Sequence, residues 1–155
     1  MSEWIWPYIA VTTLALARLL VPPERWRELF VSALLGGFSL TFPVQYLFGV
    51  VLGAWTHHYP FWNVLDVPVW LAVAWFGETL IFLHYLPQRM VSMLVYITAF
   101  AVATAAMGGI MAALGVRPLL GGWTVIEMFI LGFVLHFAIV GIDFMIRGAS
   151  VANKI

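Results

Sequence analysis

Apolar residues run along the chain in five long stretches, separated by short breaks that carry proline, glycine or charge. The stretches cover residues 4–21, 28–53, 66–86, 90–114 and 123–146, with ends uncertain by about two to four residues. A helix needs about 20 mostly apolar residues to cross a hydrocarbon core of about 30 Å. The pattern therefore predicts an all-α polytopic membrane protein. We expect residues 1–155 to form a single domain, a bundle of five transmembrane helices.

Composition supports a membrane protein over a soluble one. Of the 155 residues, 64% are hydrophobic and 9% are charged, whereas soluble domains average about 45–50% apolar and about 25% charged residues. The net charge is zero, and the absence of a basic run argues against nucleic-acid binding. The chain has no cysteine, which excludes disulfides, thiolate zinc sites and iron–sulfur clusters. We expect the lipid bilayer to be the main partner.

The distribution of basic residues predicts the orientation. With five spans, six of the seven basic residues fall on the side that holds the C-terminus: Arg18, Arg25, Arg27, Arg89, Arg147 and Lys154. Short loops retain Lys and Arg in the cytoplasm. We therefore expect the N-terminus outside and the C-terminus in the cytoplasm, in a multi-pass protein of the cell (cytoplasmic) membrane.

Two ionisable residues are predicted to meet near the middle of the membrane. At a rise of about 1.5 Å per residue, Glu78 lies about 3 Å inward of the centre of the third span, and His136 lies about 2 Å inward of the centre of the fifth. The two residues are therefore expected at the same depth. Such a pair can share a proton, and each partner offsets part of the other's desolvation. The pair is either a proton-carrying site or a structural hydrogen bond. As a third alternative, Glu78 stays protonated and bonds a backbone carbonyl.

The other polar residues indicate no catalytic or metal site. His57 and His58 are adjacent in the predicted outer loop, a pattern too common to indicate a metal. A bis-histidine haem between His84 and His136 is excluded because their predicted depths differ by about 7 to 9 Å. We expect no cofactor. Asp143 and Arg147 are spaced for a local ion pair at the cytoplasmic end of the fifth span.

Two patterns predict how the helices pack. The fourth span carries small residues four apart, Ala101, Ala105, Gly109 and Ala113. This spacing places them on one face, where another backbone can approach closely. The ridge is either a dimer interface or a contact with the first, second or fifth span. In the second span, Pro43 cannot donate to the carbonyl of Ser39, so we expect a kink whose freed groups are bonded by nearby Ser or Thr.

Several short segments carry a family resemblance: Arg18 with Trp26–Glu28, the block Ile81–Pro87, Gly122-Trp123, and Leu135-His136. In their order along the chain, these segments resemble a group of small five-span membrane proteins of spore-forming Firmicutes. The resemblance covers most of the chain after residue 15. It implies a location and a span count but no activity.

Three functions fit these observations. The first is a non-enzymatic structural or regulatory membrane component, with a homodimer or another membrane protein as partner. The second is a small homodimeric transporter or proton-coupled translocator that uses Glu78 and His136. The third is an enzyme acting on lipid, which is least favoured because the polar residues are scattered rather than clustered at one interface.

Overall fold

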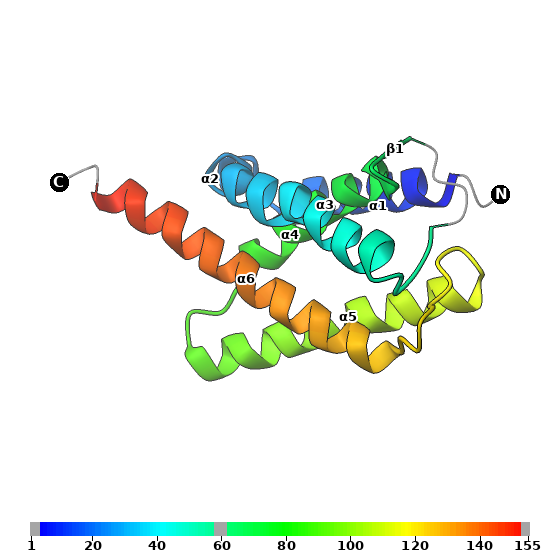
Figure 1. Ribbon diagram of the computed structural model, residues 1–155. Helices are drawn as coiled ribbons and strands as arrows, with labels where there is room; N and C mark the ends of the chain where they lie inside the picture. Colours follow the sequence, from blue (N-terminus) through cyan, green and yellow to red (C-terminus); the bar gives the residue numbers. More distant parts are fainter. Residues whose placement is uncertain (1–3, 58–61, 153–155) are drawn as a thin grey trace.

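The residues that the structure describes form five helical rods and one very short hairpin. The computed structural model describes residues 4–57 and 62–152 (Figure 1). The second rod is continuous over 23–51 but irregular, and it comprises α2, η2, α3 and η3. The elements in chain order are α1 (Ile5–Leu20), α2 (Pro23–Ala33), η2 (Leu34–Ser39), α3 (Leu40–Gln45), η3 (Tyr46–Val51), β1 (Asn63–Val64), β2 (Val67–Pro68), α4 (Val69–His84), α5 (Met90–Ala113) and α6 (Val125–Ala152).

The rods form two groups. α1 packs along α4, and the second rod lies against α4 from its other side, whereas α5 packs along α6. Figure 1 shows α5 below the other helices, with α6 running diagonally from beside α5 up to the level of α2. α6 also contacts α2 and η2, so it joins the two groups. The main apolar core lies between them, around Phe82, Leu83, Ile97 and Ile139.

The all-α prediction is confirmed, and the lengths of the helices refine it. Three are long and apolar enough to cross a membrane: Pro23–Val51, Met90–Ala113 and Val125–Gly148. α1 and α4 are apolar but have only 16 residues each. Within the predicted span 66–86, the helix begins three residues after the start of the span. Val67 and Pro68 pair with residues 63–64 in the hairpin, which delays the start of α4 to Val69.

The second rod shows how the chain accommodates a proline within an apolar helix. Pro43, where a kink was expected, lies inside α3, and two π-helical segments, η2 and η3, flank that helix. The hydroxyl of Thr41 donates to the carbonyl oxygen of Gly37 at 2.6 Å, which satisfies a carbonyl of the irregular stretch.

The predicted small-residue ridge on α5 is divided in the structure. Ala101 and Ala105 are buried, and Ala101 faces Gly132 of α6. Gly109 is only half-buried near Val125, and Ala113 is exposed. The buried row turns instead through Gly108, because a spacing of four residues drifts around a helix of 3.6 residues per turn. The buried part of the ridge thus packs within the chain.

Two glycines elsewhere lie against the backbone of a neighbouring helix. A Cβ built on Gly77 of α4 would lie 3.0 Å from the backbone carbonyl carbon of Thr13 in α1. A Cβ on Gly37 would lie 2.7 Å from the backbone oxygen of Trp75. Both neighbours are backbone atoms that cannot move aside. These two glycines therefore set how closely α1 and the second rod approach α4.

The outer surface of the helices is apolar. Large side chains such as Val91, Val95 and Ile126 are each at least 66% exposed, which a lipid environment accommodates and water does not. Trp6 and Trp55 lie near the ends of the apolar stretches, where aromatic residues commonly form a belt at the membrane interface. Both are instead buried against other side chains. Their indole rings therefore line the interior of the bundle.

Candidate functional site

Glu78 of α4 and His136 of α6 meet at the boundary between the two groups of helices. The distance between His136 Nε2 and Glu78 Oε1 is 3.2 Å, so the contact predicted from their depths is present. The His136 side chain is 1% exposed and that of Glu78 is 28% exposed. The hydrogen bond of Glu78 is made to a side chain, in contrast to the alternative in which it bonds a backbone carbonyl.

A second hydrogen bond fixes the tautomer of His136. Its Nδ1 lies 2.7 Å from the carbonyl oxygen of Gly132, one helical turn earlier. A carbonyl only accepts, so Nδ1 carries a proton and donates it. In neutral His136, Nε2 is then an acceptor that needs a protonated Glu78 as donor. In charged His136, Nε2 is a donor that suits an ionised Glu78. The contact therefore requires one proton shared between the two side chains.

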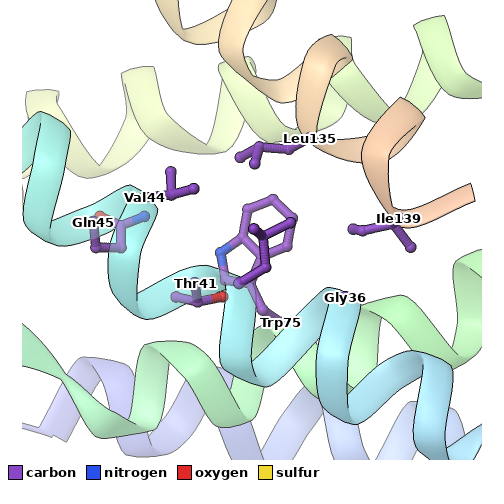
Figure 2. A pocket seen from close by; sticks show the side chains of 8 residues that line it. Gly36, Thr41, Val44, Gln45, Trp75, Leu135 and Ile139 are labelled. Atoms are coloured by element: carbon purple, nitrogen blue, oxygen red, sulfur yellow. The ribbon is translucent and has the colours of Figure 1, made fainter. Parts of the chain in front are cut away.

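Aromatic rings surround this imidazole. The ring centroids of Phe82, Phe100 and Trp75 lie 4.9, 5.7 and 5.7 Å from that of His136. The Phe82 ring meets the imidazole edge-on at an interplanar angle of 66°, and the rings of Trp75 and Phe100 are tilted to it by 42° and 58°. On its other side Trp75 borders a void of about 10 Å³ among Thr41, Gln45 and Ile139 (Figure 2). That void holds at most about one water.

Glu78 also faces a groove. A cavity of about 260 Å³ lies between α1, α4 and α5, and Glu78 lines it together with Thr13 and Thr104. His136 does not line it. One face of the carboxyl group is thus held by a sealed imidazole, while the other is open to a space that a ligand or water can enter.

A second polar contact joins the helices near the C-terminal end. Asp143 of α6 is fully buried. It accepts a hydrogen bond from the hydroxyl of Ser32 in α2 at 2.9 Å, and it forms the predicted ion pair with Arg147. The sequence indicated the local ion pair but not Ser32, because no periodicity relates residues 111 positions apart. The contact fixes α6 against the second rod.

A buried polar cluster at the opposite end was not foreseen. The guanidinium of Arg117 lies 4.1 Å from the ring centroid of Trp55, whose indole N–H donates to Gln45 Oε1 at 3.0 Å. His57 Nε2 lies 3.3 Å from the same oxygen, and its ring meets that of Trp6 edge-on. The one signal in the sequence was that Arg117 alone breaks the asymmetry of basic residues.

Burial shifts both titratable groups of this cluster. Loss of hydration lowers the pKa of Arg117 to about 9, so it remains a cation at neutral pH. Burial, followed by the positive charge of Arg117, lowers the pKa of His57 to about 3. His57 is therefore neutral at pH 7, and it donates through Nε2–H because Gln45 Oε1 accepts.

The remaining sequence candidates have local roles or none. Glu127 accepts from the backbone N–H of Thr124 at 2.8 Å and also from its hydroxyl, which in turn accepts from the backbone N–H of Ile126. This arrangement caps α6. His84 lies at the end of α4 beside Tyr85, and His58 lies outside the described residues. Within 4–57 and 62–152, no three His, Asp or Glu side chains are grouped to hold a metal.

Comparison with known proteins adds no relative. No protein-family model, curated protein or solved structure matches the chain.

Proposed function

We propose that the chain is a five-span protein of the cell membrane that acts without enzymatic chemistry, as a regulatory component sensitive to protonation. Its N-terminus is outside and its C-terminus is in the cytoplasm. The observation that carries the proposal is the Glu78–His136 contact, which has a locked tautomer and one face open to a groove. Because the two residues belong to different groups of helices, a change in protonation alters how the groups hold together.

The arrangement of the helix ends supports the orientation. Figure 1 shows the C-terminal end of α6, the start of α2 and the α4–α5 connection at one end of the molecule, with the N-terminus at the other. The first end carries Arg18, Arg25, Arg27, Arg89 and Arg147, as expected of a cytoplasmic side. α1 and α4 each rise about 24 Å over 16 residues. This length is shorter than a hydrocarbon core of about 30 Å. Local thinning of the bilayer and the residues that flank each helix can make up the difference.

Nuclear magnetic resonance of the ¹⁵N-labelled histidines tests the proposal directly, because ¹⁵N shifts report the tautomer and charge of each ring. We expect His136, assigned by loss of its signals in His136→Asn, to show a protonated Nδ1. Its Nε2 signal should move with pH in the wild type and lose that movement in Glu78→Gln. The matched control is Glu127→Gln, which removes a carboxylate from the same helix as His136. A His136 signal that is unaffected by both pH and Glu78→Gln contradicts the proposal.

A proton-coupled translocator is the second candidate, and the groove beside Glu78 favours it. The groove lies between α1 and α4 on one side and α5 on the other, so relative movement of the two groups would open or close it. Five spans are few for a monomeric transporter, and this candidate includes a homodimer. In proteoliposomes the wild type and Glu127→Gln should then dissipate a pH gradient, whereas Glu78→Gln should not. No dissipation by the wild type leaves the regulatory function.

Membership of the group of small five-span membrane proteins is part of the same proposal. It rests on the short segments shared with that group, such as Ile81–Pro87 and Leu135-His136. In the structure the first of these segments ends α4 and the second contains the imidazole of the shared-proton contact.

A further inference from the structure

The groove beside Glu78 runs lengthwise through one half of the bundle. Its lining on α5 extends from Phe100 to Met111, and Arg117 lies at its outer end. The eleven residue-to-residue steps between Phe100 and Met111 rise about 16 Å, close to half of a hydrocarbon core of about 30 Å. The groove therefore has the length of one leaflet, measured from the end near the N-terminus to the middle of the bundle.

One wall of the groove faces outward from the bundle. Met107 is 50% exposed and Ala103 is also exposed, although both line the cavity. Exposed side chains on a membrane-spanning helix contact lipid rather than water. The cavity of about 260 Å³ lies just below the usual range of ligand sites, about 300–1,000 Å³. It suits one narrow chain entering from the bilayer.

The end of the groove near Arg117 carries unused hydrogen-bond donors. Arg117 Nε and the indole nitrogen of Trp6 are both buried without a partner among the described residues, and both side chains line the groove. The two side chains are 8% and 3% exposed. No described carboxylate forms an ion pair with Arg117, and His57 beside it is neutral at pH 7. A buried cation with a second free donor calls for an anionic oxygen group.

We propose that this groove binds an anionic lipid of the adjacent leaflet, with the headgroup on Arg117 and Trp6 and one acyl chain along α5 toward Glu78. The carboxyl group of Glu78 limits how deep the chain reaches, because an ionisable group is a poor neighbour for a methyl end. The proposal requires only that the helices are embedded in a bilayer. It does not depend on a proton-binding role for the Glu78–His136 contact.

Native mass spectrometry of the purified protein tests the site with two lipids that have the same acyl chains, phosphatidylglycerol and phosphatidylcholine. We expect the wild type to bind phosphatidylglycerol about tenfold more tightly or better, the ratio that one charge-assisted hydrogen bond supplies. Arg117→Gln should reduce phosphatidylglycerol binding to the level of phosphatidylcholine. Trp6→Phe, which keeps a ring but removes the donor, should weaken it several-fold. The control Arg89→Gln, an exposed cation at the opposite end, should change nothing.

Two further arms keep the test decisive. Ala103→Phe fills the groove from its exposed wall without touching Arg117, so it should weaken binding of both lipids even if Arg117→Gln fails to fold. Inorganic phosphate at millimolar concentration should not displace phosphatidylglycerol, because it lacks the chain. Equal binding of the two lipids by the wild type, unchanged binding in Ala103→Phe, or full displacement by phosphate would each overturn the proposal.

Discussion

Removing the partner of His136 should destabilise the protein by an amount that the geometry bounds. Glu78→Leu leaves Nε2 of a side chain that is 1% exposed without a partner, and an unsatisfied buried polar group costs about 1–3 kcal/mol. The larger cost of breaking a buried ion pair, about 3–5 kcal/mol, does not apply, because a neutral His136 keeps its Nδ1–H bond to the Gly132 carbonyl and leaves no unpaired charge. Glu78→Gln can donate its amide N–H to Nε2, so we expect it to cost less than about 1 kcal/mol.

The reverse substitution should be less costly at this contact. After His136→Leu, the carboxyl group of Glu78 can protonate or turn toward the groove, where solvent or a ligand satisfies it. The double variant lacks both polar groups, so its loss of stability should be smaller than the sum of the two single losses by about 1–2 kcal/mol.

Thermal unfolding in one detergent measures this double-mutant cycle. For a chain of this size, 1 kcal/mol corresponds to a shift in Tm of about 2–4 °C. The control is the same cycle on Glu127 and His136, which make no mutual contact and should be additive within about 0.5 kcal/mol. Additivity of the Glu78 and His136 variants within that margin would refute the reasoning, because it would mean that the two side chains do not depend on each other.

Three other predictions follow from the packing, the loops and the buried cluster. Gly77→Ala places a Cβ against the backbone of α1 and should lower stability by about 1–3 kcal/mol in thermal unfolding, whereas Gly141→Ala, which meets nothing within 4 Å, should be neutral or stabilising. Leu65 and Asp66 both have positive φ in the hairpin turn. Leu65→Asn with Asp66→Gly should therefore raise Tm, and an unchanged or lower Tm would argue against strain there. Because burial lowers the pKa of His57 to about 3, the unfolded chain binds more protons between that pH and about 6.5. The contribution of His57 to the free energy of unfolding should be fully present above pH 6.5 and should fall below that pH, by at most about 1.4 kcal/mol per pH unit. His57→Gln should flatten this dependence on pH.

The structure gives the two ends of the bundle different polar chemistry. Near the C-terminus, Asp143 is bonded by both Ser32 and Arg147, so its charge is balanced. At the other end the cation of Arg117 has an aromatic face but no carboxylate among the described residues. A balanced site stabilises the fold, whereas a buried unbalanced cation is retained at a cost in free energy. This difference is why the lipid site is assigned to the Arg117 end.

The sequence by itself determined the features that depend on local pattern. Long apolar runs separated by proline predicted five helices and their approximate ends, because the period of a helix and the missing N–H of proline act over a few residues. The rise per residue also predicted that Glu78 and His136 lie level, since both helices run in the same direction, and the structure places them 3.2 Å apart. The same arithmetic ruled out a contact between His84 and His136.

Only the tertiary structure decided how each helix is rotated and what surrounds each polar group. The repeat of small residues on α5 did not show that the buried face would pass through Gly108 instead of Gly109, because that choice depends on the shape of α6. Trp6 carried a pattern typical of an interfacial belt, yet it is buried beside a groove that separate helices build together. The bond from Gly132 that fixes the tautomer of His136 depends on a side-chain rotamer, which packing selects and no linear pattern records.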